Sequence, residues 1–178
     1  LAALIERASR GDERAWEDLV GLYAGRVYAM AQSRVRRPDL AEEITQSVFV
    51  TVAITLKERR YDEQGRFEPW LFRVTMNRVR DAARRMRRHA APVDPGTLEA
   101  STLAADPAAP FDPDEAATLR RALAALNEAD REVIELRHHG RMNFKDIAAV
   151  LGEPVGTVLA RHHRALRKLR DLIGPAGP

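Results

Sequence analysis

The sequence has no cysteine among its 178 residues. Disulfides and thiolate metal sites are therefore excluded, and the composition is compatible with a reducing cytoplasm. The chain also lacks an apolar run of about 18 residues, which excludes a transmembrane helix, and its first residues show no signal-peptide pattern. We expect a cytoplasmic protein without a membrane partner.

Patterns typical of catalysis and of metal binding are missing as well. There is no glycine-rich phosphate loop, no His-Glu-x-x-His sequence and no glycine-flanked serine elbow. The pairs His138/His139 and His162/His163 are poor metal candidates, because neighbours in a helix point about 100° apart. We expect no enzymatic activity, no cofactor and no metal site.

Strand signals are almost absent, and the long segments have helical periodicity. Apolar residues repeat at intervals of three and four between Trp16 and Ala31. A helix is expected from Pro38 to about Leu56, and another over 70–88 after a loop at 57–69. A hydrophobic fraction of 45% is enough for packed cores. These patterns predict an all-α fold.

Charge and proline divide the chain into three parts. Residues 1–88 hold 18 Lys/Arg against 13 Asp/Glu, residues 89–118 hold none against 6, and residues 119–178 hold 11 against 7. Five prolines fall within 89–113. We therefore expect two small helical domains, 1–88 and 114–178, joined by an extended acidic linker over 89–113. Two basic domains suit two contacts with one polyanion.

The helix expected over 70–88 carries the strongest charge signal. Residues 73–88 contain seven arginines and one acid, Asp81, which indicates phosphate binding. Aromatic side chains in the preceding loop are suited to stacking on unpaired bases. The alternative is that they anchor the loop to the core. Anchoring is favoured for Trp70, and both interpretations stay open for Tyr61.

Phe49 is expected to lie off the core face of its helix, among carboxylates. An exposed phenylalanine there indicates a protein-binding surface, while a contact with a satellite core explains the pattern equally well.

Residues 143–170 predict a helix-turn-helix. Asn143 can cap a short helix, Gly152 can end it, and Pro154 stands where a basic second helix begins. In this layout the second helix enters the major groove. Its inward positions are Val158, His162, Ala165 and Leu169, and its partner-facing positions are Leu159, Ala160, His163, Arg164 and Arg167.

Several short stretches follow one another in a specific order. They are Gly-Asp-Glu-Arg-Ala-Trp at 11–16, Asp-Leu-Ala-Glu-Glu-Ile-Thr-Gln-Ser-Val-Phe at 39–49, Phe-Glu-Pro-Trp-Leu-Phe-Arg-Val at 67–74, Asp-Arg-Glu-Val at 130–133, Asp-Ile-Ala at 146–148 and Pro-Val-Gly-Thr-Val at 154–158. With this order around an acidic linker, nearly the whole chain resembles bacterial RNA polymerase sigma factors of the extracytoplasmic-function type.

The resemblance implies two kinds of partner, core RNA polymerase and promoter DNA. The first domain would bind the clamp helices of the β′ subunit through Asp39, Glu42, Glu43, Gln46 and Phe49. It would recognise and open the −10 element through Tyr61, Phe67, Asn77, Arg80, Asp81, Arg84, Arg85 and Arg88. The second domain would contact the β flap and read the duplex −35 element through Thr157, Leu159, Ala160, Arg161, His163, Arg164 and Arg167. An anti-sigma factor is a further partner that the resemblance allows.

The expected −35 reader departs from the family pattern. Family members usually carry a polar or basic residue and then serine where this chain has Leu159 and Ala160. They usually have an apolar residue at His162 and arginine at Leu166. Fewer hydrogen-bonding groups then face the bases, so recognition would depend on thymine methyl groups and on backbone shape.

Two other classes of protein fit parts of the sequence. One is a stand-alone helix-turn-helix regulator that binds duplex operators while its first domain senses a ligand or dimerises. The other is a protein-interaction module whose arginine-rich helix binds acidic partners. An arginine helix after an aromatic loop suits melted DNA better than it suits a ligand pocket, which favours the sigma factor.

Overall fold

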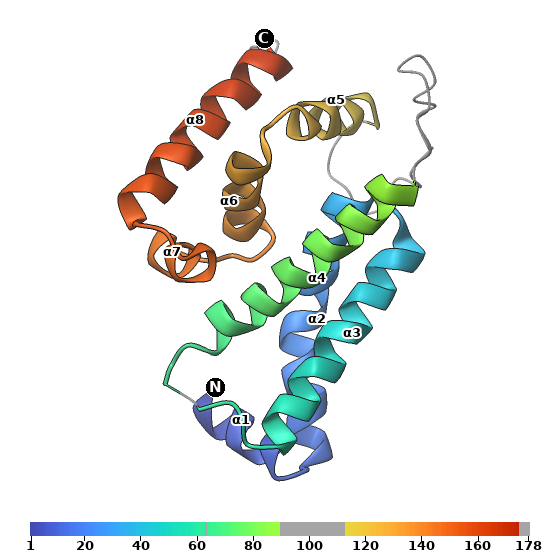
Figure 1. Cartoon of the computed structure of the whole chain (residues 1–178), viewed down its shortest axis with the longest axis vertical. Coiled ribbons are helices and arrows are strands. Elements are labelled where there is room, and N and C mark those ends of the chain that lie inside the picture. Colours follow the sequence, from blue (N-terminus) through green and yellow to red (C-terminus); the bar gives the residue numbers. More distant parts are fainter. Residues whose placement is uncertain (63, 90–112, 175–178) are drawn as a thin grey trace. The chain divides into compact units, whose positions relative to one another are not determined.

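The structure, a computed structural model, describes residues 1–62, 64–89 and 113–174. Every regular element in these ranges is an α-helix, so the predicted all-α class is confirmed (Figure 1). Within the same ranges, no helix has the length and apolar character needed to cross a membrane.

The chain divides into two compact units, residues 1–99 and 100–178. The acidic linker expected over 89–113 lies almost entirely outside the described residues, so its extended form and the domain boundaries at 88 and 114 stay predictions. Each unit is therefore described by itself.

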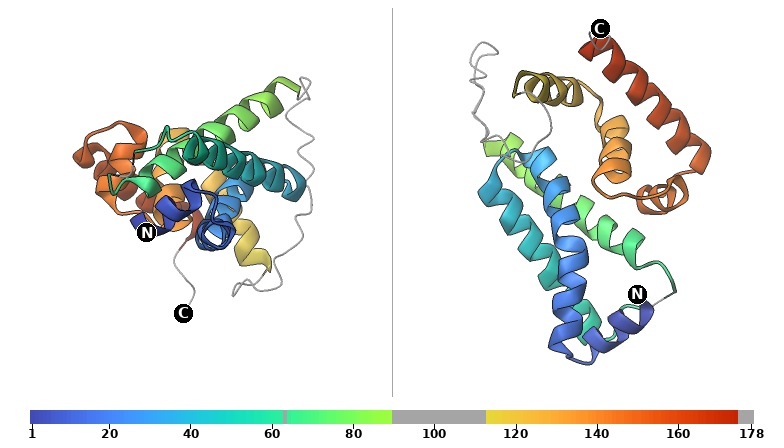
Figure 2. Two further views of the ribbon diagram at one scale, coloured as in Figure 1. Left: turned by 90° about the horizontal axis from the view of Figure 1, so that it is seen from below. Right: turned by 180° about the vertical axis from the view of Figure 1, so that it is seen from behind.

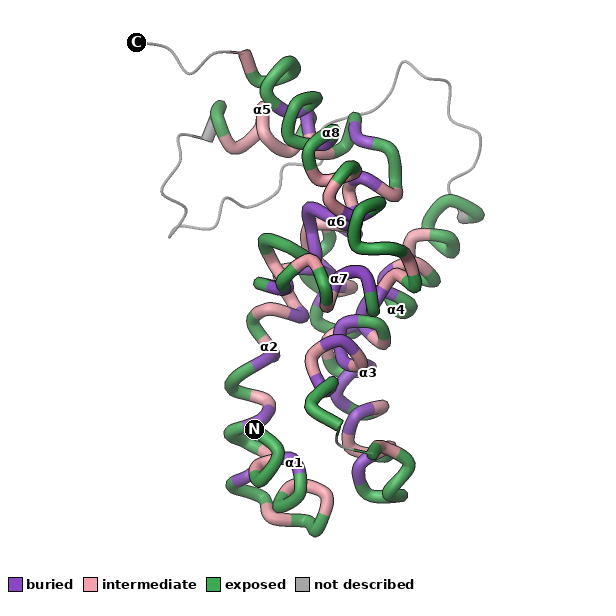
Figure 3. The backbone as a smooth tube through the Cα atoms, turned by 90° about the vertical axis from the view of Figure 1, so that its left-hand side faces the viewer, coloured by how far each residue is buried: buried purple, intermediate pink, exposed green. Residues whose placement is uncertain are grey.

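The first unit is a helical bundle. Its helices are α1 (Ala2–Ser9), α2 (Glu13–Val35), α3 (Pro38–Lys57) and α4 (Phe67–His89). The helices α2, α3 and α4 pack against one another, and α1 contacts α2 and α3 (Figures 1 and 2). The largest fully buried side chains of this core are Leu19, Val27, Met30, Val48, Val52, Phe67, Leu71, Phe72 and Met76. Figure 3 shows the buried positions recurring along the helices of this bundle, as the apolar spacing predicts.

Local signals set the helix ends in this unit, with one correction. The Asp12 carboxylate accepts a hydrogen bond from the Ala15 amide at 3.0 Å and so caps α2. The helix α4 begins at Phe67, three residues before the predicted start, and the connection is 58–66. Its first turn holds Glu68 and a proline, both of which helix N-termini favour.

The second unit has four helices in the residues that the structure describes. It comprises α5 (Pro113–Ala124), α6 (Glu128–His138), α7 (Phe144–Leu151) and α8 (Val155–Ile173). The first three pack against α8, and one core cluster consists of Ala122, Leu126, Ile134, Ala165 and Leu169. The helix α5 starts at Pro113, so Asp114 lies within its first turn.

The turns around α7 follow the predicted chemistry. Asn127 accepts from the Asp130 amide at 2.8 Å, and Asn143 accepts from the Asp146 amide at 2.9 Å, so both asparagines cap helices. Gly152 ends α7 with φ 70°, in the left-handed region that favours glycine. Gly140 follows α6 where a Cβ atom would lie 2.5 Å from the Leu136 carbonyl oxygen, which explains the glycine there.

Candidate polymerase and nucleic-acid interfaces

The helix α4 has one buried face and one strongly basic face. Its buried positions are Leu71, Phe72, Thr75, Met76, Val79 and Ala82. Its exposed positions include the predicted site residues Asn77, Asp81, Arg84, Arg85 and Arg88, while Arg80 is half-buried. Arg84 and Asp81 form an exposed ion pair at 3.7 Å, which contributes little to stability. The guanidinium groups of Arg84 and Arg85 are therefore accessible to a phosphate.

An aromatic cluster lies where α4 begins. The ring of Tyr61 lies 5.7 Å from that of Phe67 and 4.8 Å from that of Trp70, and Tyr23 of α2 closes on Phe67 at 5.5 Å. Phe67 is only 1% exposed. Its predicted contact with DNA is therefore wrong for this structure, because its ring fills the core. Tyr61 and Trp70 are half-buried, so each is anchored and still reaches the surface.

A polar contact fixes the same end of α4 to α2. The Glu68 carboxylate accepts from the Tyr23 hydroxyl at 3.1 Å and from Arg26 Nη1 at 3.0 Å. The Arg26 guanidinium also lies over the Phe72 ring, 4.8 Å from its centroid. Glu68 is 42 residues from Arg26, so no local pattern pairs them. The only signal in the sequence is an acid in the first turn of a helix.

The helix α3 presents a polar face beside an apolar depression. Its predicted polymerase-binding residues Asp39, Glu42, Glu43 and Gln46 are all exposed. Asp39 pairs with Arg37, whose hydrogen bond holds the pKa of that carboxyl below its usual range. The depression, with a volume of about 600 Å³, lies between α2 and α3 and is lined by Trp16, Val20, Ala24, Thr45, Gln46, Phe49, Val50 and Ala53.

Phe49 belongs to the core. It is 7% exposed, and its ring meets Trp16 edge-on with the centroids 6.2 Å apart. The expectation of an exposed Phe49 is wrong, and the alternative of a core contact is confirmed. Val50, the next residue, is 57% exposed and borders the same depression. Val50 is therefore the exposed apolar side chain of α3 that lines this depression.

The helix α8 buries the predicted face. Val158, Ala165 and Leu169 are buried and His162 is half-buried, which confirms the inward set. Of the predicted DNA-binding residues, Thr157, Ala160, His163, Arg164 and Arg167 are exposed, and Leu159 and Arg161 are half-buried.

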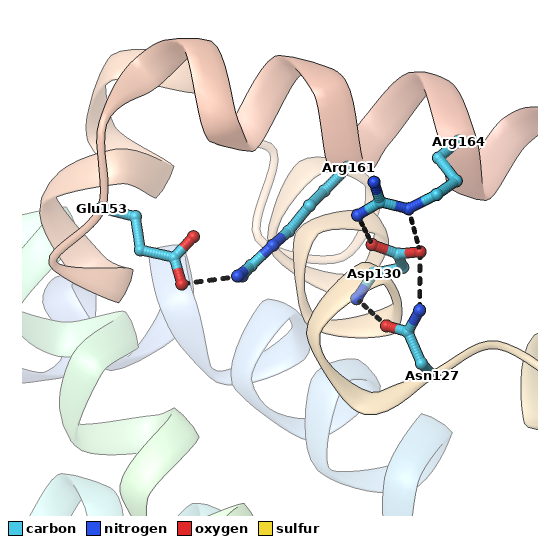
Figure 4. Close-up of polar contacts among 5 residues, drawn as sticks. All are labelled: Asn127, Asp130, Glu153, Arg161 and Arg164. Atoms are coloured by element: carbon cyan, nitrogen blue, oxygen red, sulfur yellow. Dashed lines mark hydrogen bonds and ion pairs between the residues drawn. The ribbon is translucent and has the colours of Figure 1, made fainter.

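Two of those predicted residues make ion pairs within the unit (Figure 4). Arg161 Nη1 lies 2.7 Å from a carboxylate oxygen of Glu153, in the turn before α8. Arg164 donates through Nε and Nη2 to the two carboxylate oxygens of Asp130, at 2.9 and 2.8 Å. Asn127 Nδ2 donates to the same carboxylate at 2.8 Å. Arg164 and then Asn127 hold the pKa of Asp130 below its usual range.

Histidines meet at the packing surface of α6, α7 and α8. The His162 ring stacks on His138 with the centroids 6.2 Å apart, and Phe144 meets it edge-on at 5.0 Å. Burial and then the neighbouring cations lower the pKa of His162. No group of three His, Cys, Asp or Glu side chains placed to hold a metal occurs in the part of the chain that the structure describes.

Taken with the arginine face of α4, the helix-turn-helix defines a helical DNA-binding protein of two units. The model of sigma-70 region 2 matches residues 19–89, and that of sigma-70 region 4 matches residues 122–171. The chain belongs to the sigma-70 family of RNA polymerase sigma factors, in its extracytoplasmic-function group. The predicted resemblance is confirmed.

Individual relatives match over most of the chain. RNA polymerase sigma factor CarQ of Myxococcus xanthus is 35% identical, over 96% of this chain and 95% of its own. ECF RNA polymerase sigma factor SigW of Bacillus subtilis is 29% identical, over 94% and 96%. The solved structure of CnrH, in complex with the cytosolic domain of CnrY, superposes with a TM-score of 0.72 at 28% identity, over 96% of this chain and 95% of that one.

The matches decide between the classes of protein considered above. Because region 2 of the family covers the first unit, a stand-alone operator-binding regulator is not favoured. The chain is a sigma factor, which binds core RNA polymerase and directs it to promoters.

Proposed function

We propose that the two units of this sigma factor divide the promoter between them. The first unit holds core polymerase on α3 and opens the −10 element with α4, and the second unit reads the duplex −35 element with α8. The observation that carries this division is the exposed arginine face of α4, because a helix with this charge density suits phosphates of a melted strand. Tyr61 and Trp70 at its start offer half-buried rings to unpaired bases.

The polymerase-binding surface is proposed to be the polar face of α3 together with the depression beside it. Gln46 and Val50 line the apolar hollow, and the exposed polar residues Asp39, Glu42 and Glu43 precede them on the same helix. An apolar centre with a polar rim is the usual composition of a protein interface. Phe49 supports this surface from the core.

The proposal also includes an anti-sigma partner, action in the cytoplasm and no catalytic reaction. The structural similarity to CnrH, solved with the cytosolic domain of CnrY, supports an anti-sigma partner for this chain. Action in the cytoplasm follows from its work with RNA polymerase. We assign it no catalytic reaction of its own, because a sigma factor contributes by binding.

The division of labour is tested by Arg84→Ala/Arg85→Ala in the full chain with core polymerase. Each of these arginines can donate a charge-assisted hydrogen bond to a phosphate, and the double variant removes both. Promoter opening should therefore fall by on the order of tenfold or more. Permanganate reactivity of unpaired thymines measures the opening, and co-purification measures core binding. The expected result is lost opening with unchanged core binding.

The matched control is Arg10→Ala/Arg14→Ala, which removes the same charge from exposed positions on the same unit. This variant should open promoters like the parent. Equal loss of core binding and opening in Arg84→Ala/Arg85→Ala would contradict the division, and so would equal opening defects in the two double variants.

A further inference from the structure

The first two turns of α8 present a surface with few hydrogen-bonding side chains. Val155, Gly156, Thr157 and Ala160 are exposed there, and Leu159 is half-buried. Among these five, only Thr157 carries a polar side-chain group. In a helix-turn-helix the N-terminal residues of the second helix contact the base edges. The part of α8 that would meet the bases therefore offers mainly methyl and methylene groups.

The arginine next to this surface, Arg161, forms an ion pair with the turn before α8. Arg161 is 22% exposed at its side chain, and its Nη1 lies 2.7 Å from Glu153, which itself is only 27% exposed. The ion pair joins the second turn of α8 to the loop between α7 and α8 (Figure 4). Extending Arg161 to a base would separate this pair and leave the half-buried Glu153 carboxylate without its cation.

Arg164 is held in place by a buried acid of its own unit. A bidentate contact with guanine O6 and N7 needs two parallel N–H groups of one guanidinium. In the structure Nε and Nη2 of Arg164 both donate to Asp130, whose side chain is 2% exposed. Breaking this pair would leave a buried carboxylate without its cation, which is unfavourable. The outer edge of Arg164, with one N–H group each of Nη1 and Nη2, can still donate, but Arg164 lies in the third turn of α8, beyond the first residues of the helix.

The remaining cations of α8 lie beyond the first two turns. Lys168 donates to the Ala125 carbonyl oxygen at 2.7 Å, and Arg167 is exposed. Contacts from these side chains to phosphates supply affinity and register without sequence information. The groups on the first two turns of α8 then supply sequence preference that these phosphate contacts lack.

We infer that this unit reads the −35 element chiefly through the C5-methyl groups of thymine, which Leu159 and Ala160 contact, and less through arginine contacts with guanine. The inference rests on the proposed reading of duplex DNA by α8 and specifies what is read. Thymine is the base that presents a methyl group in the major groove. Gly156, with open space where a Cβ would stand, lets the helix backbone approach the bases closely.

The test uses holoenzyme reconstituted from core polymerase and the full chain. Its preferred −35 sequence is first selected from duplexes randomised over that element. Affinity is then measured for duplexes in which single −35 thymines are replaced by uracil, which removes only the methyl group, or single guanines by 7-deazaguanine, which removes the N7 acceptor. Each contacted methyl should be worth about fourfold in affinity, and 7-deazaguanine should change affinity less than about twofold.

Leu159→Ala identifies the protein side of the contact. In the parent chain, replacing the contacted thymine by uracil should lower affinity about fourfold. In Leu159→Ala the same replacement should lower affinity hardly at all, because the substitution and the uracil remove the same contact. The control is Leu172→Ala, which removes an equally apolar side chain, 46% exposed, from the last turn of the same helix. Leu172→Ala should keep the full uracil penalty. The uracil comparison with the parent chain needs no variant, so it holds even where Leu159→Ala lowers stability.

Two outcomes would overturn the inference in distinguishable ways. If 7-deazaguanine weakens binding and uracil does not, arginine reads guanine, through the outer edge of Arg164 or through Arg161 released from Glu153, and the methyl-based recognition is wrong while −35 reading stands. If scrambling the whole −35 element changes nothing and core binding persists, then α8 does not read this element, and that part of the proposed function fails with it.

Discussion

His162 stands where the surrounding side chains favour its neutral form. It faces His138 and Arg137 of α6, Phe144 of α7 and its neighbour His163. Burial is the largest cause of its lowered pKa, and the three basic neighbours act in the same direction. The unfolded chain therefore binds the proton first as the pH falls below about 6.5. This contribution to stability is complete above that pH and is lost as the pH falls toward the folded-state pKa.

We predict that His162→Leu weakens the loss of stability between pH 7.5 and pH 5.5. Leucine fills the same half-buried position without a group to protonate, so the melting temperature should fall less on acidification than it does in the parent chain. Part of the fall should persist, because burial also lowers the pKa of His139. Circular dichroism melting curves across this range measure the effect.

The adjacent histidine provides the control. His163 is exposed, and His163→Gln should keep most of the parent's pH dependence. A melting temperature that falls equally with pH in His162→Leu and in the parent would show that His162 does not carry the effect.

At the scale of elements, the sequence predicts what local chemistry determines. Asn143 and Gly152 set the two ends of α7 by contacts within a few residues, and the structure has both in place. The inward face of α8 follows in the same way from its spacing, because burial repeats with the helical period.

Contacts between elements could not be predicted in this way. Asp130 and Arg164 are 34 residues apart, so the sequence shows Arg164 on the partner-facing side of α8 without revealing its ion pair. The resemblance places Phe67 at the −10 element, and the pattern leaves Phe49 open between a surface and a core contact, because spacing along the chain does not reveal what a neighbouring helix covers. The candidate site was therefore predicted as a set of faces, and which side chains on each face are available depends on the tertiary structure.

The helix α3 shows how that distinction changes an experiment. Phe49→Ala should cost about 3–5 kcal/mol of stability, since it empties a core position beside Trp16. Val50→Glu changes an exposed side chain and should alter stability by less than about 0.5 kcal/mol. If α3 binds polymerase as proposed, Val50→Glu should weaken core binding about tenfold, because a charge is then buried without a partner. Chemical denaturation and co-purification with core polymerase measure the two quantities.

Leu22→Glu is the matched control, because Leu22 is also 57% exposed and lies on α2 outside the depression. It should leave core binding unchanged. Parent-like core binding by Val50→Glu would remove the depression from the proposed polymerase surface.

At the scale of the whole molecule, charge is segregated along a chain of two units with separate cores. Residues 1–88 carry a net +5, residues 89–118 carry −6, and residues 119–178 carry +4. Each unit has its own buried cluster, so each is expected to fold without the other. Once one unit is bound to the DNA, the tether raises the local concentration of the other unit beside it.

We therefore predict that the separate fragments 1–89 and 113–178 each unfold cooperatively. Without the tether, they should no longer bind the two promoter elements cooperatively. With core polymerase and fragment 1–89 present, protection of the −35 element should need on the order of 100-fold more of fragment 113–178 than of the intact chain. Footprinting of the −10 and −35 elements over a concentration series measures this. A full-length chain cut after purification within 90–112 controls for fragment preparation and should behave like the mixture. Equal protection of the −35 element by the mixture and by the intact chain would mean that the tether contributes nothing to promoter affinity.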